Sequence, residues 1–293
     1  MATMPPTRID GSLLQFKTPK GIALCGFLRE PPRRSRIAVI HIHGMGSFFW
    51  SNTALEVLRA SVDAGVGAIS INTHGSGDRN RLRGSRRTLA YGGTDHERFT
   101  DCVDDIDGAI TAMRRLGYTR FILSGHSTGC QKVTHYQARK KNRAVRGLIL
   151  LAPCDDVAIK RREIGAAYER CVKSAKRLID AGKPHATMPA ACRTTFDATR
   201  YHQLYSPRSI EGNIFNYQTS LTMHSAIRVP VLAVFGRNEP YAIKPVMEML
   251  WMLASRFRHI SSAAVLIEGD HGFRGAQDQL RNTVQHWIRR ITS

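Results

Sequence analysis

A serine with a glycine two residues before it and another two residues after it is the feature of this sequence that most directly suggests chemistry. Ser127 lies in Ser124-Gly125-His126-Ser127-Thr128-Gly129, a G-x-S-x-G pattern between a short apolar run at 120–123 and a segment of helical period that begins at Thr128. A nucleophile on a sharp strand-to-helix turn requires such neighbours, because larger side chains would collide with the turn. The following helix also favours negative charge beside its N-terminus. We therefore interpret Ser127 as a candidate nucleophile.

Around this turn, short apolar runs alternate with longer segments of helical period, which predicts a parallel sheet covered by helices and hence an α/β fold. The predicted strands are residues 37–42, 66–71, 120–123, 145–151, 229–235 and 263–267. Ahead of them, residues 12–16 and 22–28 predict an N-terminal antiparallel pair. The predicted helices are residues 53–64, 94–116, 128–141, 243–257 and 276–291.

The predicted helix at 94–116 has the clearest end signals. Thr94-Asp95-His96-Glu97 has the residue types of a capping box, and Gly117 follows Arg114-Arg115. The acids of its early turns are Asp101, Asp104, Asp105 and Asp107. A helix dipole and solvent account for these acids, so we expect no catalytic role for them.

A long segment interrupts the alternation of strands and helices. Residues 155–225 contain no strand-like run, whereas 159–179 has a helical period. An insertion of this length between two core strands is too long for an ordinary loop. We predict a helical cap at 155–225, inserted into a core made of 1–154 and 226–293.

A second motif follows the predicted strand 37–42 and reads His41-Ile42-His43-Gly44-Met45-Gly46. Together with the serine turn and the order of elements, it resembles the α/β-hydrolase superfamily, from about Ile9 to Ile291. The resemblance implies a mostly parallel twisted sheet with helices on both faces and a mainly helical cap. It also implies that the backbone N–H groups of Met45 and Thr128 form an oxyanion hole.

The short strings His-Gly-Met-Gly and Gly-His-Ser-Thr-Gly-Cys-Gln are similar to those of a narrower branch of this superfamily. That branch includes fungal siderophore esterases and feruloyl-esterase-like proteins.

In this superfamily the base comes last along the chain, after the final strand. Gly269-Asp270-His271-Gly272-Phe273 lies between the last apolar run and the last predicted helix, so the resemblance implies His271 as the base. We interpret Asp270 as a turn residue, and His126 as a packing or orienting residue.

The acid that would orient the base is less clearly marked in the sequence. After the predicted strand 229–235 the superfamily usually has G-x-x-D, whereas this chain has Gly236-Arg237-Asn238-Glu239. Glu239 is our first choice, since a glutamate can also stabilise the imidazolium. A shift of one residue would place Asn238 there instead, and Asp155 or Asp156 would then be the alternative acid.

Two further segments are candidates for substrate-binding walls. The aromatic residues Phe48, Phe49 and Trp50 follow the predicted oxyanion loop, where packing against the cap is an equal alternative. His74 lies in a turn where many relatives have arginine, so this chain lacks that charge there.

Composition excludes several classes of protein. A chain of 293 residues with 42% hydrophobic residues can build a large core. The sequence contains no run of 18 apolar residues, so we expect no membrane-spanning helix. The formal net charge is +20, but the basic excess is spread over 29–36, 79–98, 139–146 and 160–183. We therefore expect a basic surface rather than nucleic-acid binding. Residues 1–10 lack a signal-peptide pattern, so we expect a cytoplasmic protein.

Six cysteines occur without metal-ligand spacing: Cys25, Cys102, Cys130, Cys154, Cys171 and Cys192. We expect them to be reduced thiols, and we expect no zinc site and no organic cofactor.

These observations predict a serine esterase that uses Ser127, His271 and Glu239 on a small-molecule ester. The basic cap, with 11 Lys plus Arg against 7 Asp plus Glu in 155–225, favours an anionic ester. Acyl transfer, lactone, amide or C–C cleavage and a non-catalytic binding role remain alternatives, and self-association into a homodimer is left open.

Overall fold

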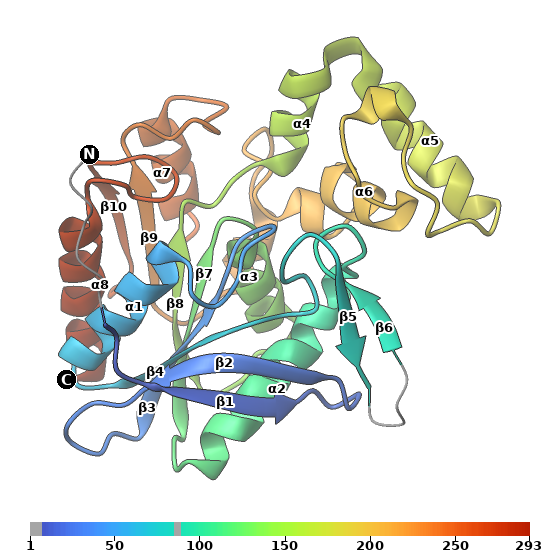
Figure 1. Ribbon diagram of the computed structural model, residues 1–293. Helices are drawn as coiled ribbons and strands as arrows, with labels where there is room; N and C mark the ends of the chain where they lie inside the picture. Colours follow the sequence, from blue (N-terminus) through green and yellow to red (C-terminus); the bar gives the residue numbers. More distant parts are fainter. Residues whose placement is uncertain (1–7, 85–88) are drawn as a thin grey trace, which may run out of the picture.

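Eight strands form one mostly parallel sheet in the computed structural model, which describes residues 8–84 and 89–293 (Figure 1). The strand order is β1-β2-β4-β3-β7-β8-β9-β10. The first two strands form the predicted antiparallel pair, β2 pairs antiparallel with β4, and the remaining neighbours are parallel. Residues 1–7 of the segment without a signal-peptide pattern, and Arg86 and Arg87 of the basic stretch 79–98, lie outside the described residues.

The strands of this sheet are β1 (Ser12–Lys17), β2 (Ala23–Arg29), β3 (Ile37–Ile42), β4 (Gly67–Ile71), β7 (Arg120–His126), β8 (Val145–Leu151), β9 (Val231–Gly236) and β10 (Ala263–Ile267). A separate hairpin contains β5 (Asn80–Arg83) and β6 (Leu89–Gly92). The helices are α1 (Asn52–Asp63), α2 (Cys102–Arg115), α3 (Thr128–Lys140), α4 (Asp156–Ile164), α5 (Tyr168–Asp180), α6 (Ala198–Tyr205), α7 (Val246–Ala254) and α8 (Gln277–Thr292).

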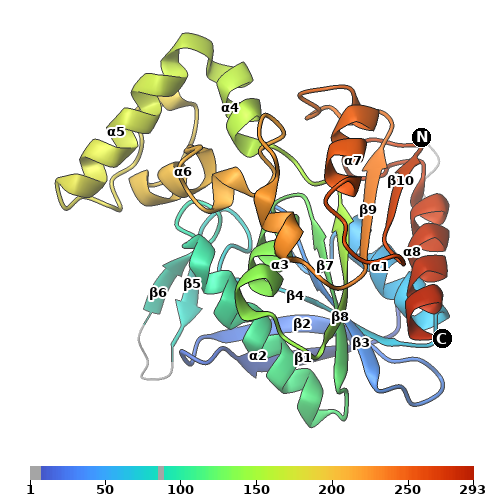
Figure 2. The same ribbon diagram turned by 180° about the vertical axis from the view of Figure 1, so that it is seen from behind.

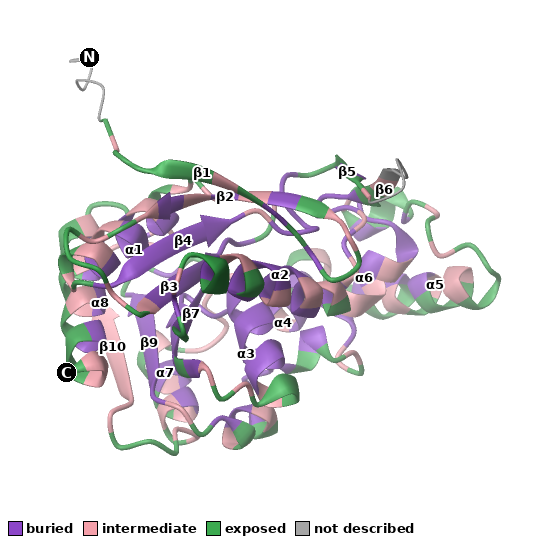
Figure 3. Ribbon diagram, turned by 90° about the horizontal axis from the view of Figure 1, so that it is seen from below, coloured by how far each residue is buried: buried purple, intermediate pink, exposed green. Residues whose placement is uncertain are grey.

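Helices cover both faces of the sheet, as expected for the α/β class. Successive residues of a strand point to opposite faces, so Ile122 joins a cluster with α1 and α8, whereas Leu123 joins a cluster with α2, α3 and α7. The central strands are therefore mostly apolar on both faces, and Figure 3 shows most of their residues as buried. No helix within the described residues is long and apolar enough to cross a bilayer.

The N-terminal end predicted for the second helix is wrong. A 3-10 turn at Phe99–Asp101 precedes α2, which begins at Cys102. Thr94 and Glu97, the residues of the predicted capping box, instead make tertiary contacts: the Thr94 hydroxyl accepts a hydrogen bond from the Gly46 amide, and Glu97 pairs with a buried lysine. The hairpin β5–β6 occupies part of a connection for which no strand was predicted.

The segment between β8 and β9 contains α4, α5 and α6, which lie together beyond one end of the sheet (Figures 1 and 2). Residues between Cys171 and Tyr205 form a hydrophobic cluster of their own. Ile214, Phe215 and Tyr217 pack instead into the main core, so the separate packing of the cap ends before them.

One expectation about the cysteines is also wrong. Cys171 in α5 and Cys192 form a disulfide with a Cα–Cα distance of 5.7 Å, across a sequence separation of 21 residues. Cys25, Cys102, Cys130 and Cys154 are free thiols. The two bonded cysteines are distant in sequence, and only the fold of the cap brings them together.

Candidate active site

The turn between β7 and α3 holds Ser127 in a conformation that few residues adopt. Its φ is 53° and its ψ is −125°, outside the ordinary regions for a residue with a side chain. A Cβ on Gly125 would lie 2.3 Å from the Gly129 carbonyl oxygen, and one on Gly129 would lie 2.3 Å from that of Ile42. Gly125 is therefore required because the turn brings the Gly129 backbone close to it, and Gly129 is required because the end of β3 lies close to it.

His271 and Glu239 meet because they follow neighbouring parallel strands. Glu239 follows β9 and His271 follows β10, and the carboxyl ends of parallel strands share one edge of the sheet. His271 Nδ1 lies 3.0 Å from Glu239 Oε1 and 2.9 Å from Oε2. Glu239 is buried, whereas Asn238 is exposed and its amide donates to the Gly269 carbonyl. The structure thus brings Glu239, and not Asn238, to the histidine.

The two alternative acids have other partners. Asp155 caps α4 by accepting a hydrogen bond from the Ala158 amide at 2.9 Å, and it also accepts from the Tyr217 amide at 3.1 Å. Asp156 accepts from the Gln131 side chain at 2.5 Å. Neither carboxylate is hydrogen-bonded to His271 in the described part of the chain.

His126 supports the backbone of the loop that follows β10 and contains His271, residues 268–276, which we call the histidine loop. Its Nε2 donates to the His271 carbonyl oxygen at 2.8 Å, and the two rings lie 4.9 Å apart. Burial, reinforced by the nearby His271, lowers the pKa of His126 to about 4, so this imidazole is neutral near pH 7. The Tyr241 ring meets His271 edge-on from another direction. The placement of His126 agrees with the predicted orienting role.

The predicted oxyanion loop, residues 44–46 after β3, is held in place by a buried histidine. His43 Nδ1 donates to the Gly44 carbonyl at 2.7 Å, while its Nε2 accepts from the Ser76 hydroxyl at 2.7 Å. Because the C=O and N–H of a trans peptide point in opposite directions, anchoring the Gly44 carbonyl also orients the Met45 N–H. Among the described residues, the amides of Met45 and Thr128 donate no hydrogen bond. Neither N–H group is therefore occupied by a protein acceptor. Met45 lines the cavity described below, whereas Thr128 is buried and is not one of its lining residues.

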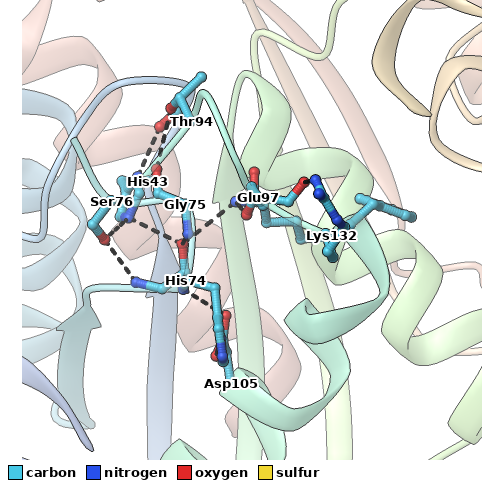
Figure 4. A network of polar contacts seen from close by, with 12 residues as sticks. His43, His74, Gly75, Ser76, Thr94, Glu97, Asp105 and Lys132 are labelled. Carbon is cyan, nitrogen blue, oxygen red and sulfur yellow. Dashed lines mark hydrogen bonds and ion pairs between the residues drawn. The ribbon is translucent and has the colours of Figure 1, made fainter. Parts of the chain in front are cut away.

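Figure 4 shows how this loop is connected to charged groups in the interior. The Thr94 hydroxyl accepts a hydrogen bond from the Gly46 amide at 2.7 Å and donates one to the Gly75 carbonyl at 3.1 Å. Nearby, Lys132 of α3 pairs with Glu97 at 2.5 Å, and both side chains are almost fully buried. Burial alone would raise the pKa of Glu97, but Lys132 and Arg200 hold it at about 2.

Arg200 extends this network into the cap. It lies on α6, is fully buried, and contacts Glu97 at 3.4 Å and Glu211 at 2.5 Å. A residue of α6 thereby contacts the buried pair of Glu97 and Lys132.

A cavity of about 580 Å³ opens beside Ser127 and His271. The oxyanion loop contributes Gly44 and Met45, and Tyr241 lies on the side of the histidine loop. The opposite wall comes from the cap and consists of Asp156, Ile159, Lys160 and Glu163 of α4, with Tyr205 at the end of α6. These spacings place the α4 residues on neighbouring positions of one helix. The helical period predicted for 159–179 includes three of them but did not identify them as a cavity wall.

The four residues predicted to form substrate walls do not line this cavity. Phe48 stacks on Trp50 with ring centroids 4.5 Å apart, and Phe49 meets Trp50 edge-on. His74 is buried and contacts Asp105 at 2.5 Å. Burial lowers the pKa of His74, but the Asp105 carboxylate outweighs burial and raises it. Asp105, expected on the solvent side of a helix, is thus a buried partner of His74.

One group of side chains has donor atoms close enough to bind a metal ion outside this cavity. Donor atoms of His96, His185 and Asp197 lie within 4.8 Å of one another. The Arg98 guanidinium contacts both His185 Nδ1 and Asp197 Oδ2 at 2.9 Å. Because a cation already pairs with these donors, the cluster is better described as an ion-paired contact between the loop before α2 and the cap.

Several solved esterases and hydrolases align with this chain over nearly its whole length. The siderophore hydrolase EstB from Aspergillus fumigatus aligns with a TM-score of 0.66 and 16% identity, covering 99% of this chain and 100% of that chain. Est1E from Butyrivibrio proteoclasticus aligns with a TM-score of 0.63 and 15% identity, covering 96% and 99%. A thermostable carboxyl esterase from Bacillus coagulans aligns with a TM-score of 0.65 and 15% identity, covering 97% and 99%.

These alignments confirm the α/β-hydrolase fold over nearly the whole chain. A comparison with curated protein sequences finds no match. A family model described as "Protein of unknown function (DUF1749)" matches residues 86–289, which is more than half of the chain. The protein therefore has the α/β-hydrolase fold and belongs to the DUF1749 family.

Proposed function

We propose that the protein is a serine hydrolase that cleaves a carboxylic ester of a small molecule. The observation that carries this proposal is the contact of His271 Nδ1 with the buried Glu239 carboxylate, at 2.9 Å, beside the same cavity as Ser127. A base oriented by an acid and a serine on a strained turn are the parts that acyl transfer to a hydroxyl requires. The esterases among the similar folds support this reaction class.

The proposed reaction proceeds through an acyl-enzyme. With Nδ1 bonded to Glu239, His271 Nε2 takes the proton from the Ser127 hydroxyl as its oxygen attacks the ester carbonyl. The amides of Met45 and Thr128 stabilise the resulting oxyanion. His271 then returns the proton to the departing alcohol. Water attacks the acyl group with His271 again as base, releasing the acid and regenerating Ser127.

The charges of the cavity favour a neutral ester over an anionic one. The two cationic side chains that line it are paired, Lys160 with Glu163 at 2.7 Å and Arg274 with Asp270 at 2.9 Å. A carboxylate on the substrate would have to compete with these acids. We therefore propose that matched neutral esters are hydrolysed at least as fast as anionic ones, in contrast to the preference suggested by the basic composition of the cap.

The alternative of a non-catalytic binding protein depends on a decayed acid site and requires Glu239 to lie apart from His271. The observed contact counts against it. The same catalytic groups also serve acyl transfer and the cleavage of amides, lactones or C–C bonds. These reactions differ from ester hydrolysis in the bond that is cleaved or in the molecule that accepts the acyl group.

The proposed function is tested with purified wild-type protein and Ser127→Ala on a panel of aryl and alkyl esters, with products identified by mass spectrometry. We expect wild-type protein to release acid and alcohol, and Ser127→Ala to lose at least about 10³-fold of the rate. Added methanol tests for acyl transfer, since a transferase forms the methyl ester in preference to the acid. Full activity of Ser127→Ala contradicts the proposal.

A further inference from the structure

A second carboxyl group lies in the cavity and has no part in the proposed reaction. Asp156 is the first residue of α4, and a short connection, residues 152–155, joins it to the end of β8. It is only 7% exposed, yet it lines the same cavity as Ser127 and His271. A polar group that is buried and still faces a cavity is a candidate contact for a ligand.

Only one oxygen of this carboxyl group has a protein partner. Oδ2 accepts a hydrogen bond from Gln131 Nε2 at 2.5 Å. Oδ1 has no hydrogen-bond partner among the described residues. It is absent from the fully buried unpartnered atoms of those residues, so it keeps some contact with solvent. The oxygen that remains accessible is therefore the one available to a molecule in the cavity.

No cation is paired directly with Asp156. Lys160, one turn along α4, is bonded to Glu163 at 2.7 Å and to the Arg193 carbonyl at 3.1 Å. Arg200 of α6 pairs with Glu211, at 2.5 Å. Each of these two cations is thus paired with an acid other than Asp156.

Two neighbouring carboxylates, Glu211 and Asp155, favour the neutral form of Asp156. The Tyr205 hydroxyl and the thiols of Cys130 and Cys154 also lie nearby, and they are uncharged at neutral pH because burial raises the pKa of each. Burial, followed by the charge of Glu211, raises the pKa of Asp156 to about 8, although Arg200 and the Gln131 hydrogen bond act in the opposite direction. At neutral pH the carboxyl is therefore mostly protonated. Since Oδ2 accepts from Gln131, a proton on Oδ1 leaves that hydrogen bond intact.

We propose that Asp156 is a specificity residue that donates a hydrogen bond from Oδ1 to an uncharged oxygen of the substrate, such as a ketone or ether oxygen away from the scissile ester. This inference rests on the proposed ester hydrolysis and narrows its substrate class. An ester with such an oxygen replaces a buried, unpaired donor by a hydrogen bond, whereas a purely hydrocarbon ester leaves the donor unpaired.

The proposal predicts a pH dependence of selectivity. Asp156 donates only while protonated, so the preference for the oxygen-containing ester is present below a pH of about 8 and is lost as the pH rises through that value. An asparagine at this position offers an N–H donor at every pH. Leucine has a similar size and no donor.

The experiment compares wild-type protein, Asp156→Asn and Asp156→Leu on two pairs of esters. In one pair, para-nitrophenyl hexanoate is compared with its keto analogue near the chain end. In the other pair, hexyl acetate is compared with the corresponding keto-alkyl acetate. The measured quantity is the ratio of kcat/KM within each pair, so a general loss of activity in a variant cancels.

We expect wild-type protein to prefer the keto ester in one pair, and Asp156→Leu to reduce that ratio about 5- to 10-fold. Asp156→Asn should retain the preference and remove its fall above pH 8. Equal ratios in wild-type protein and Asp156→Leu for both pairs overturn the proposal. Loss of the preference in Asp156→Asn also overturns it, because a donor alone is then insufficient.

Binding measurements separate this inference from the proposed function. Calorimetry with Ser127→Ala, and with the same variant carrying Asp156→Leu, gives the ratio of Kd values for each ester pair without turnover. A ratio that depends on Asp156 supports the recognition role even where no ester is hydrolysed, and ratios independent of Asp156 overturn it. Hydrolysis that requires Ser127 supports the proposed function in either case.

Discussion

Both carboxylate oxygens of Glu239 lie within hydrogen-bond distance of His271 Nδ1, at 3.0 and 2.9 Å. This pairing directs Nε2, the second ring nitrogen, away from the acid. A buried carboxylate in this position keeps the imidazole in one tautomer and stabilises the cation that forms when the base takes a proton.

The first prediction concerns this acid. Glu239→Gln retains the size of the side chain but removes its charge, so we expect kcat to fall by about 10²- to 10⁴-fold. Asn238→Ala is the matched control, since Asn238 is the exposed neighbour of Glu239. Ester hydrolysis measured for both variants gives the answer. Unchanged kcat in Glu239→Gln would exclude the proposed acid.

The second prediction concerns the histidine beneath the oxyanion loop. His43→Ala removes the hydrogen bond that orients the Gly44–Met45 peptide, so we expect kcat to fall by about 10²-fold with KM nearly unchanged. His224→Ala is the control, because it removes an equally buried imidazole that does not line the cavity. Equal losses of kcat in the two variants would show that His43 acts only through stability.

The third prediction concerns the stability of the charge network. Lys132→Met leaves Glu97 with one cation fewer in the interior, so we expect the free energy of unfolding to fall by about 3–5 kcal/mol. Because the pKa of Glu97 is held at about 2, below its unfolded value of about 4.3, its contribution is present above pH 4.3 and is lost as the pH falls toward 2.

Urea denaturation at pH 7 and pH 3 measures both effects. Lys132→Met combined with Glu97→Gln should lose less stability than Lys132→Met alone, since no carboxylate is then left with fewer partners. A larger loss in the double variant would argue against the ion pair as the cause.

The fourth prediction concerns the disulfide of the cap. Replacing Cys171 and Cys192 together by alanine should destabilise the cap by about 3 kcal/mol, because the bond closes a loop of moderate length. Limited proteolysis should then cut faster within α5 and the residues that follow it. Cys25→Ala, which removes a free thiol of the core, is the control. Equal rates of cleavage in all three proteins would contradict the prediction.

The sequence predicts most of the sheet because buried parallel strands are continuous apolar runs. The predicted ranges 37–42, 145–151 and 263–267 agree with β3, β8 and β10. The resemblance to the superfamily, through the order of motifs along the chain, also predicts that Ser127, His271 and Glu239 share a site. Ser127 and His271 line one cavity and His271 contacts Glu239, while the catalytic roles of all three stay predictions for the experiments above.

Features that depend on distant contacts could not be predicted in this way. The apparent capping box before α2 has the right local pattern, but Glu97 is used by Lys132 and Arg200 from other helices. Likewise, His74 is buried and contacts Asp105 of α2, so it does not line the cavity. The cavity wall on α4 depends on how the cap folds over the sheet, which a periodic pattern alone does not specify.

Covalent labelling of Ser127 tests the central claim most directly. Wild-type protein and Ser127→Ala are treated with a fluorophosphonate, and the modified peptides are mapped by mass spectrometry. The account predicts one adduct, on the Ser127 hydroxyl of the wild-type protein, with parallel loss of ester hydrolysis and no adduct in Ser127→Ala. Labelling of Ser127→Ala at the same rate, or full hydrolysis by the labelled wild-type protein, would contradict it.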